Sequence, residues 1–122
     1  MAVALVWTEA VVESFCDITP TVREFILRPS GGALSHAPGG HLQLQIQVTG
    51  RPHTRSYSLV GAPDPQVYRI AIKRLDDGRG GSLAMWRFSV GDRLRVTEPQ
   101  NHFPLDLQAP AYLLVAGGIG VT

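Results

Sequence analysis

The alternation of apolar and polar residues at positions 41–49 restricts the fold of this chain more than any other feature. Four aliphatic side chains alternate with amide and hydroxyl side chains, in the order Leu42, Gln43, Leu44, Gln45, Ile46, Gln47, Val48 and Thr49. Successive side chains of an extended chain point to opposite faces. The segment is therefore predicted to be a β-strand that buries one face and leaves the other in water.

Glycine and proline interrupt the chain at short intervals, with 13 glycines and 9 prolines among 122 residues. This spacing favours short strands over long helices. Runs rich in aliphatic, aromatic and β-branched residues predict strands at residues 4–16, 22–28, 41–49, 54–60, 67–75 and 93–98. One short helix is predicted where a glycine-rich loop leads into residues 83–86. The pattern is typical of an all-β fold, an antiparallel barrel or sandwich that closes to hide its edges.

The last segment differs from the rest. Residues 111–116 form a continuous apolar run, which is typical of a strand buried on both faces of a parallel sheet. The turn at 117–120 contains three glycines and resembles the start of a nucleotide-binding domain. Two units are therefore predicted, a β-barrel domain at 1–108 and, at 109–122, the first strand and glycine turn of a truncated NAD(P)-binding domain. The alternative is a last barrel strand with a glycine tail.

Charge and hydropathy exclude several classes of partner. The net charge is +1 and the charged residues are scattered, so neither nucleic acid nor an anionic membrane surface is an expected partner. The longest apolar run, near 109–121, is shorter than the roughly 20 residues of a membrane helix. The N-terminus lacks the features of a secretory signal.

Cysteine and histidine usage gives no metal site. Cys16 is the only cysteine, which excludes an intramolecular disulfide and favours a cytoplasmic location. It also excludes an iron–sulfur cluster held by this segment, since such a cluster takes about four thiolates. Cys16 is predicted to be buried. The four histidines, predicted to be solvated and mostly in loops, lack metal-ligand spacing: His36, His41, His53 and His102.

Residues 54–60 combine a cation, an aromatic ring and a hydroxyl on a predicted strand. Strand parity places Arg55, Tyr57 and Leu59 on one face and Ser56 and Ser58 on the other. Arginine presents a planar fork of donors that suits a phosphate group. Tyrosine offers a flat face to a flavin ring, and the serine hydroxyl can bond a ring nitrogen. The alternative is an ordinary edge strand with a surface arginine and a half-buried tyrosine.

Residues 78–86 supply the second half of the predicted site. Gly80 and Gly81 allow the backbone to approach a ligand closely, and Ser82 is a natural first-turn residue. The free amides and positive dipole of a helix N-terminus attract an anion. The spacing matches neither the dinucleotide fingerprint nor a P-loop. We therefore predict that a flavin is held between residues 54–60 and 78–86. The alternative for residues 78–86 is a glycine-rich hairpin turn without a ligand.

Together these segments resemble the ferredoxin-reductase superfamily. Within it they are most similar to the reductase components of aromatic-ring oxygenases, such as phthalate dioxygenase reductase and vanillate demethylase reductase. The resemblance covers nearly the whole chain. Five segments in the same order carry it: Arg55-Ser56-Tyr57-Ser58-Leu59, Ile70-Ala71-Ile72-Lys73-Arg74, Gly78-Arg79-Gly80-Gly81-Ser82, and residues 98–105 and 115–120.

The resemblance implies a fold and a cofactor site. The fold is a six-stranded antiparallel Greek-key barrel with one short helix. Arg55 would contact the flavin phosphate, Tyr57 the isoalloxazine ring and Ser58 its reactive nitrogen. The implied cofactor-binding set has no catalytic side chain and no metal ligand, and comprises Arg55, Ser56, Tyr57, Ser58, Ala71, Ile72, Lys73, Gly80, Gly81 and Ser82.

It also implies an NAD(P)H-dependent flavin oxidoreductase of which this chain is a fragment, inactive alone. Electrons would pass from NAD(P)H through the flavin to a [2Fe–2S] centre and then to a terminal oxygenase or demethylase component. The NAD(P)H and [2Fe–2S] domains would follow residue 122 in the parent chain. FMN is favoured over FAD, because residues 74–77, directly after Lys73, include no aromatic side chain to receive an adenine.

Two alternatives remain. One is an FAD-dependent reductase of the ferric-siderophore or flavohaemoglobin type. The other is a non-catalytic barrel that has lost its flavin and binds a partner or a carbohydrate. The sequence leaves open the oxygenase substrate and the choice between NADH and NADPH.

Overall fold

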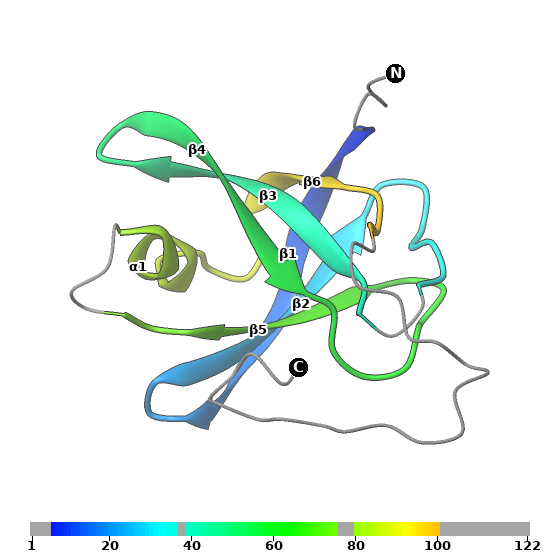
Figure 1. The fold of residues 1–122 in the computed structure, drawn as a ribbon, viewed down its shortest axis with the longest axis horizontal. Coiled ribbons are helices and arrows are strands. Elements are labelled where there is room, and N and C mark those ends of the chain that lie inside the picture. The colour runs from blue at the N-terminus through cyan, green and yellow to red at the C-terminus, as the bar shows by residue number, and fades with distance from the viewer. Residues whose placement is uncertain (1–5, 37–38, 76–79, 101–122) are drawn as a thin grey trace.

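A computed structural model of the chain describes residues 6–36, 39–75 and 80–100 (Figure 1). These residues form six strands and one short helix, as the sequence predicts. In chain order the elements are β1 Trp7–Thr19, β2 Val22–Pro29, β3 His41–Val48, β4 Arg51–Ser58, β5 Tyr68–Lys73, α1 Gly81–Trp86 and β6 Arg93–Thr97. The apolar run and glycine turn predicted at 109–122 lie outside the described residues, so the division into two domains stays a prediction.

The six strands form one antiparallel sheet in the order β4-β3-β6-β1-β2-β5. The last strand, β6, lies between β3 and β1, which makes the connectivity a Greek key. The sheet curls into a half-barrel, and its two edge strands meet where Leu59 bridges Ile70. There the Val60 amide donates to the Arg69 carbonyl over 2.9 Å. The predicted Greek-key barrel is confirmed in this curled form.

The alternating face of β3 builds the core, as its sequence predicts. Leu42, Leu44 and Ile46 are at most 1% exposed. They pack in one cluster with residues from β1, β2, β5 and β6, and Met85 joins the cluster from α1. Burial of each such side chain stabilises the fold by about 1.5–3 kcal/mol. The helix is therefore part of the core and not an appendage on the sheet.

The hairpin between β3 and β4 is tighter than the sequence suggested. Its turn consists of Thr49 and Gly50 alone, with φ of 50° and 78°, and Val48 pairs directly with Arg51. Two positive φ values suit the right-handed twist of the flanking strands. Residues 51–53 are consequently part of β4 and not a loop. Pro52 is tolerated there because β4 is an edge strand.

β1 also runs further than predicted, to Thr19, because Asp17 pairs with Arg23 and Thr19 with Val22. The prediction that Cys16 is buried is wrong, since its side chain is exposed. Cys16 pairs with Glu24, whereas the preceding pair, Phe15 and Phe25, faces the core. Strand parity therefore turns the thiol outward.

The histidines also differ from the prediction. His41 begins β3 and His53 lies within β4, so neither is in a loop, and both are half-buried and not fully solvated. His102 lies outside the described residues. In the part of the chain that the structure describes, no three His, Cys, Asp or Glu residues come together as a metal site. No helix there is long and apolar enough to cross a membrane.

Candidate flavin-binding site

Arg55 and Tyr57 share the inner face of β4, as strand parity predicts. Both are half-buried, Leu59 is 7% exposed, and Ser56 between them is exposed. Their cross-strand partners are two core residues, since Leu44 pairs with Arg55 and Leu42 with Tyr57. Directly opposed residues share a face of the sheet. The cation and the phenol are thus held side by side over the apolar interior.

The guanidinium of Arg55 uses one of its donors in a hydrogen bond within the described part of the chain. Its Nη1 donates to the carbonyl of Thr54 over 3.0 Å. Among residues 6–36, 39–75 and 80–100, no carboxylate forms an ion pair with it. An arginine carries five N–H donors in a fixed fork. A half-buried cation without an anionic partner in the described part of the chain suits an anionic ligand.

Tyr57 is a neutral phenol beside this cation. Burial raises the pKa of Tyr57 above 10.0, and the positive charge of Arg55 opposes that rise. The two groups are two residues apart on the same face of β4, which places them next to each other. The ring also packs against the core cluster. A neutral, anchored ring next to an arginine can bind a flat ligand that carries a negative group.

The two serines of β4 lie on the other face. Ser56 is exposed and pairs with Gln43, so its side chain is not on the same face as Arg55 and Tyr57. Ser58 is half-buried at the last position of β4, opposite His41. What Ser56 can offer a ligand on the inner face is its backbone.

On β5, the three predicted residues are divided between the two faces. Ile72 is 1% exposed in the core, so its side chain is not available to a ligand. Ala71 is half-buried and Lys73 exposed, both on the opposite face. β5 is an edge strand of the sheet: it pairs with β2, and on its other side Arg69 and Ile70 meet the chain just after β4. Its other edge presents backbone groups, which are what this strand can offer to a bound molecule.

The glycine loop turns into α1 through a residue in the left-handed conformation. Gly80 is the N-cap with φ of 89°, and its carbonyl accepts from the Ala84 amide over 2.9 Å. A Cβ at this position would lie 3.1 Å from Cγ1 of Val48. Both facts require glycine here. Among the described residues, no side chain caps the first turn. Gly78 and Arg79 lie outside the described residues.

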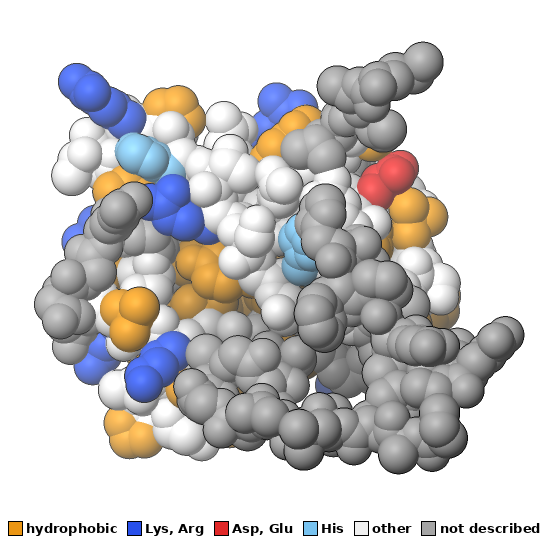
Figure 2. Space-filling view, viewed as in Figure 1, with side chains coloured by type: hydrophobic (Ala, Val, Ile, Leu, Met, Phe, Trp, Pro, Cys, Tyr) orange, Lys and Arg blue, Asp and Glu red, His pale blue; other side chains and the backbone are white. Residues whose placement is uncertain are grey.

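Ser82 does more than the sequence indicated. Its Oγ accepts a hydrogen bond from the Leu75 amide over 2.9 Å, which ties α1 to the end of β5. The hydroxyl keeps its own hydrogen for a further bond. The loop therefore contacts β3 through Gly80 and the end of β5 through Ser82. In Figure 2, the face between β4 and β5 has a hollow with a hydrophobic floor and with Lys, Arg and His side chains around it.

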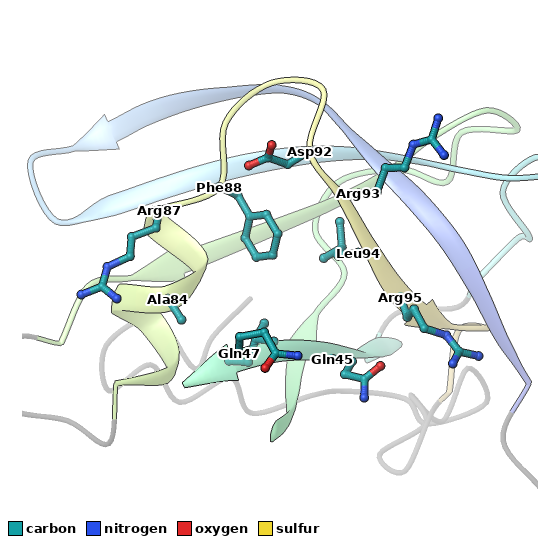
Figure 3. Close-up of a pocket in the computed structure, with 10 residues that line it drawn as sticks. Gln45, Gln47, Ala84, Arg87, Phe88, Asp92, Arg93, Leu94 and Arg95 are labelled. Atoms are coloured by element: carbon teal, nitrogen blue, oxygen red, sulfur yellow. The ribbon is translucent and has the colours of Figure 1, made fainter. Parts of the chain in front are cut away.

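The structure also contains a cavity that the sequence did not indicate. β3 and β6 pair at Leu44–Val96 and Gln45–Arg95 and then separate. A cavity of about 410 Å³ lies between the separated strands and α1. Phe88 and Leu94 point into it, whereas Arg93 points away (Figure 3). None of the predicted flavin-binding residues lines it. No local pattern could have revealed it, because it arises where two distant strands part.

Comparison with known proteins supports the family resemblance. No model of a protein family matches the sequence. The β subunit of the heme-dependent oxidative N-demethylase of Ectopseudomonas mendocina (strain ymp) is 40% identical over 114 residues, 91% of this chain and 36% of that protein. The structure of phthalate dioxygenase reductase superposes with a TM-score of 0.75 and 30% identity, over 84% of this chain and 32% of that one. The chain belongs to the ferredoxin-reductase superfamily.

Within this superfamily the chain has the fold of the flavin-binding barrel domain. The phthalate dioxygenase reductase structure is described as modular, for electron transfer from pyridine nucleotides to [2Fe–2S]. A flavohemoprotein of Rhizobium meliloti (strain 1021) is 31% identical over 126 residues, 95% of this chain and 31% of that protein. The chain thus spans about a third of the length of these relatives.

Proposed function

We propose that the chain binds FMN between β4 and α1. In this proposal it is the flavin domain of a reductase that passes electrons from NAD(P)H to a [2Fe–2S] centre. The observation that carries the proposal is the half-buried Arg55 beside the neutral Tyr57 on the inner face of an edge strand. The similarity to the N-demethylase subunit and to phthalate dioxygenase reductase supports it.

The order of groups along the sheet suits an extended ligand with an anionic end. Gly80 of the α1 loop lies against Val48, which pairs with Arg51 at the start of β4. Arg55 is four residues further on, about 13 Å along the strand, and Tyr57 follows after about 7 Å more. A phosphate between the loop and Arg55 would place the ring toward Tyr57.

Each residue then has a defined task. Arg55 would bind the phosphate from one side with its donor fork. The amides of the Gly80–Gly81 turn and the hydroxyl hydrogen of Ser82 would bind it from the other. Tyr57 would lie against the ring and shield it from water. At this point β4 ends, and Ser58 would approach the reactive nitrogen through its hydroxyl or amide.

The edge of β5 would complete the site. Ala71, Ile72 and Lys73 would contribute through their backbone, since the side chain of Ile72 is in the core. When bound, the flavin supplies the chemistry that takes up hydride equivalents and releases electrons one at a time. No side chain of this domain is required to donate a proton. Its contribution is to bind, orient and partly desolvate the cofactor.

FMN is favoured over FAD by the surroundings of an aromatic ring that contacts the end of β5. That ring is Trp86, and the guanidinium carbons of Arg23 and Arg74 lie 4.3 Å and 5.1 Å from its centroid. Two cations thus stack on this half-buried ring and would compete with an adenine for it.

The partners proposed for the whole protein follow from the relatives. They are an NAD(P)H domain and an iron–sulfur domain of the parent chain, and a terminal oxygenase or demethylase component. The single cysteine suits a reducing compartment, for which we propose the cytoplasm. A second candidate is an FAD-dependent reductase of the flavohaemoglobin type, which the similarity to the Rhizobium flavohemoprotein favours.

Extraction of the cofactor from the full protein that the gene encodes tests the proposal. FMN in the extract is expected, and FAD would support the second candidate. Arg55→Ala should weaken FMN binding by about tenfold to a hundredfold, since a charged hydrogen bond contributes ~1.5–3 kcal/mol. Arg93→Ala is the control, because the Arg93 side chain is 72% exposed and pairs with Glu9. A protein without flavin and without affinity for it would refute the proposal.

A further inference from the structure

A stack of aromatic and cationic side chains joins the β1–β2 hairpin to α1. The guanidinium carbon of Arg23 lies 4.3 Å from the ring centroid of Phe15 and 4.3 Å from that of Trp86. The cation is therefore held between two aromatic faces. Phe15 in turn contacts Phe25 of the core, with ring centroids 5.7 Å apart. The stack thus runs from the core of the barrel to the last residue of the helix.

The same guanidinium makes three hydrogen bonds in its plane. Nε and Nη2 donate to the carboxylate of Asp17 over 2.6 Å and 3.3 Å, and Nη1 donates to the carbonyl of Trp86 over 3.3 Å. The Arg23 side chain is only 15% exposed. Its contact with Trp86 lies at the end of α1, where carbonyl groups lack helical partners and a cation is favourable.

Trp86 is also held from β5. Its Nε1 donates to the carbonyl of Ile72 over 3.2 Å, and the Arg74 guanidinium lies 5.1 Å from its ring centroid. Ile72 pairs with Arg23 across β2 and β5. The tryptophan is consequently fixed by two neighbouring strands at one level of the sheet.

A helix of six residues depends on such contacts for its position. Short helices are marginal in water and are stabilised mainly by tertiary packing. For α1 these contacts are Ala84 and Met85 against the core, Trp86 at its end and Ser82 bonded to Leu75. Trp86 is the contact that fixes the C-terminal end of the helix, so its loss would leave the helix free to tilt about the core contacts of Ala84 and Met85.

We propose that Arg23 is a positioning residue for the phosphate of the flavin. It fixes Trp86 and thereby sets the orientation of the Gly80–Ser82 turn, which lies at the other end of α1. This inference rests on the proposed function. A lysine cannot replace Arg23, because it lacks the planar fork that stacks between two rings and bonds both Asp17 and the Trp86 carbonyl.

Comparison of FMN with riboflavin, which has the same ring but no phosphate, tests the inference. Affinities are measured by fluorescence titration in the full protein that the gene encodes, with its flavin removed. Arg23→Lys should lower the affinity for FMN by about tenfold and that for riboflavin by less than about twofold, because the positioned groups bind only the phosphate. Trp86→Phe, which removes the bond to the Ile72 carbonyl, should shift the same ratio in the same direction.

Arg28→Ala is the matched control, since Arg28 lies on the same strand and pairs with Glu13, with both side chains well exposed. It should change neither affinity. Equal losses for both flavins, or an unchanged ratio in Arg23→Lys and Trp86→Phe, would overturn the role of Arg23 while leaving flavin binding intact. A wild-type protein that binds neither flavin would instead refute the proposed function itself. Should Arg23→Lys unfold at the assay temperature, the ratio in Trp86→Phe decides.

Discussion

Replacement of Gly80 by alanine is expected to destabilise the fold by about 2–3 kcal/mol, from two sources. The first is the backbone, because φ of 89° is unfavourable for a residue with a Cβ by about 1–2 kcal/mol. The second is steric, since the new Cβ would lie 3.1 Å from Cγ1 of Val48. Overpacking of this kind costs about 1 kcal/mol or more, and Val48 can yield because it is half-buried.

Gly91 separates these two sources. Its φ is 94°, and a Cβ there would have no atom within 4 Å. Gly91→Ala should therefore show the backbone contribution alone, and Gly80→Ala about 1 kcal/mol more. Urea unfolding followed by circular dichroism measures both. A difference of 1 kcal/mol corresponds to about 4 °C in Tm for a chain of 122 residues.

A double-mutant cycle then assigns the excess to one contact. Val48→Ala removes Cγ1, so the combination with Gly80→Ala should be less destabilising than the sum of the two single changes, by about 1 kcal/mol. Equal effects of Gly80→Ala and Gly91→Ala would contradict the close contact. Additivity within about 0.3 kcal/mol would contradict it as well.

Three further predictions concern the core and two titrating groups. Leu44→Ala should lower the free energy of unfolding by about 2–5 kcal/mol in urea titrations, because Leu44 is fully buried; a smaller loss would contradict its place in the core. The hydrogen bond from Arg23 lowers the pKa of Asp17 below 3.8. The stability advantage of the wild type over Asp17→Asn should thus be present above pH 3.8 and vanish as pH falls through the lowered pKa, and a constant advantage would exclude this linkage. Burial raises the pKa of Tyr57 above 10.0, so the wild type should lose stability relative to Tyr57→Phe as pH rises beyond 10.0, in unfolding curves measured across that range. Parallel curves for the two proteins would show that Tyr57 is not buried as described.

Local patterns in the sequence predicted the strands well, for a physical reason. The alternation along β3 is imposed by a sheet with one buried face, and each segment of this kind can be recognised by itself. The order of the strands could not be predicted from these patterns. The insertion of β6 between β1 and β3 depends on pairs such as Trp7–Thr97, which are far apart in the sequence.

In the candidate site, too, local features could be predicted from the sequence, whereas features that depend on the tertiary fold could not. Parity along β4 correctly placed Arg55 and Tyr57 on one face, because it requires only the period of a strand. The stack of Phe15, Arg23 and Trp86 was not foreseen, since it joins three segments whose proximity follows from the tertiary fold. Cys16 was misjudged because residue type favours burial, while its register opposite Glu24 turns it outward.

The outward orientation of Cys16 has a practical consequence for experiments. The chain has a single thiol, and it projects from the β1–β2 hairpin next to Asp17. A maleimide fluorophore or spin label can therefore be attached at one defined point of this domain without prior mutagenesis. The same accessibility allows two molecules to become cross-linked in air, so handling under a reducing agent keeps the sample in one covalent form.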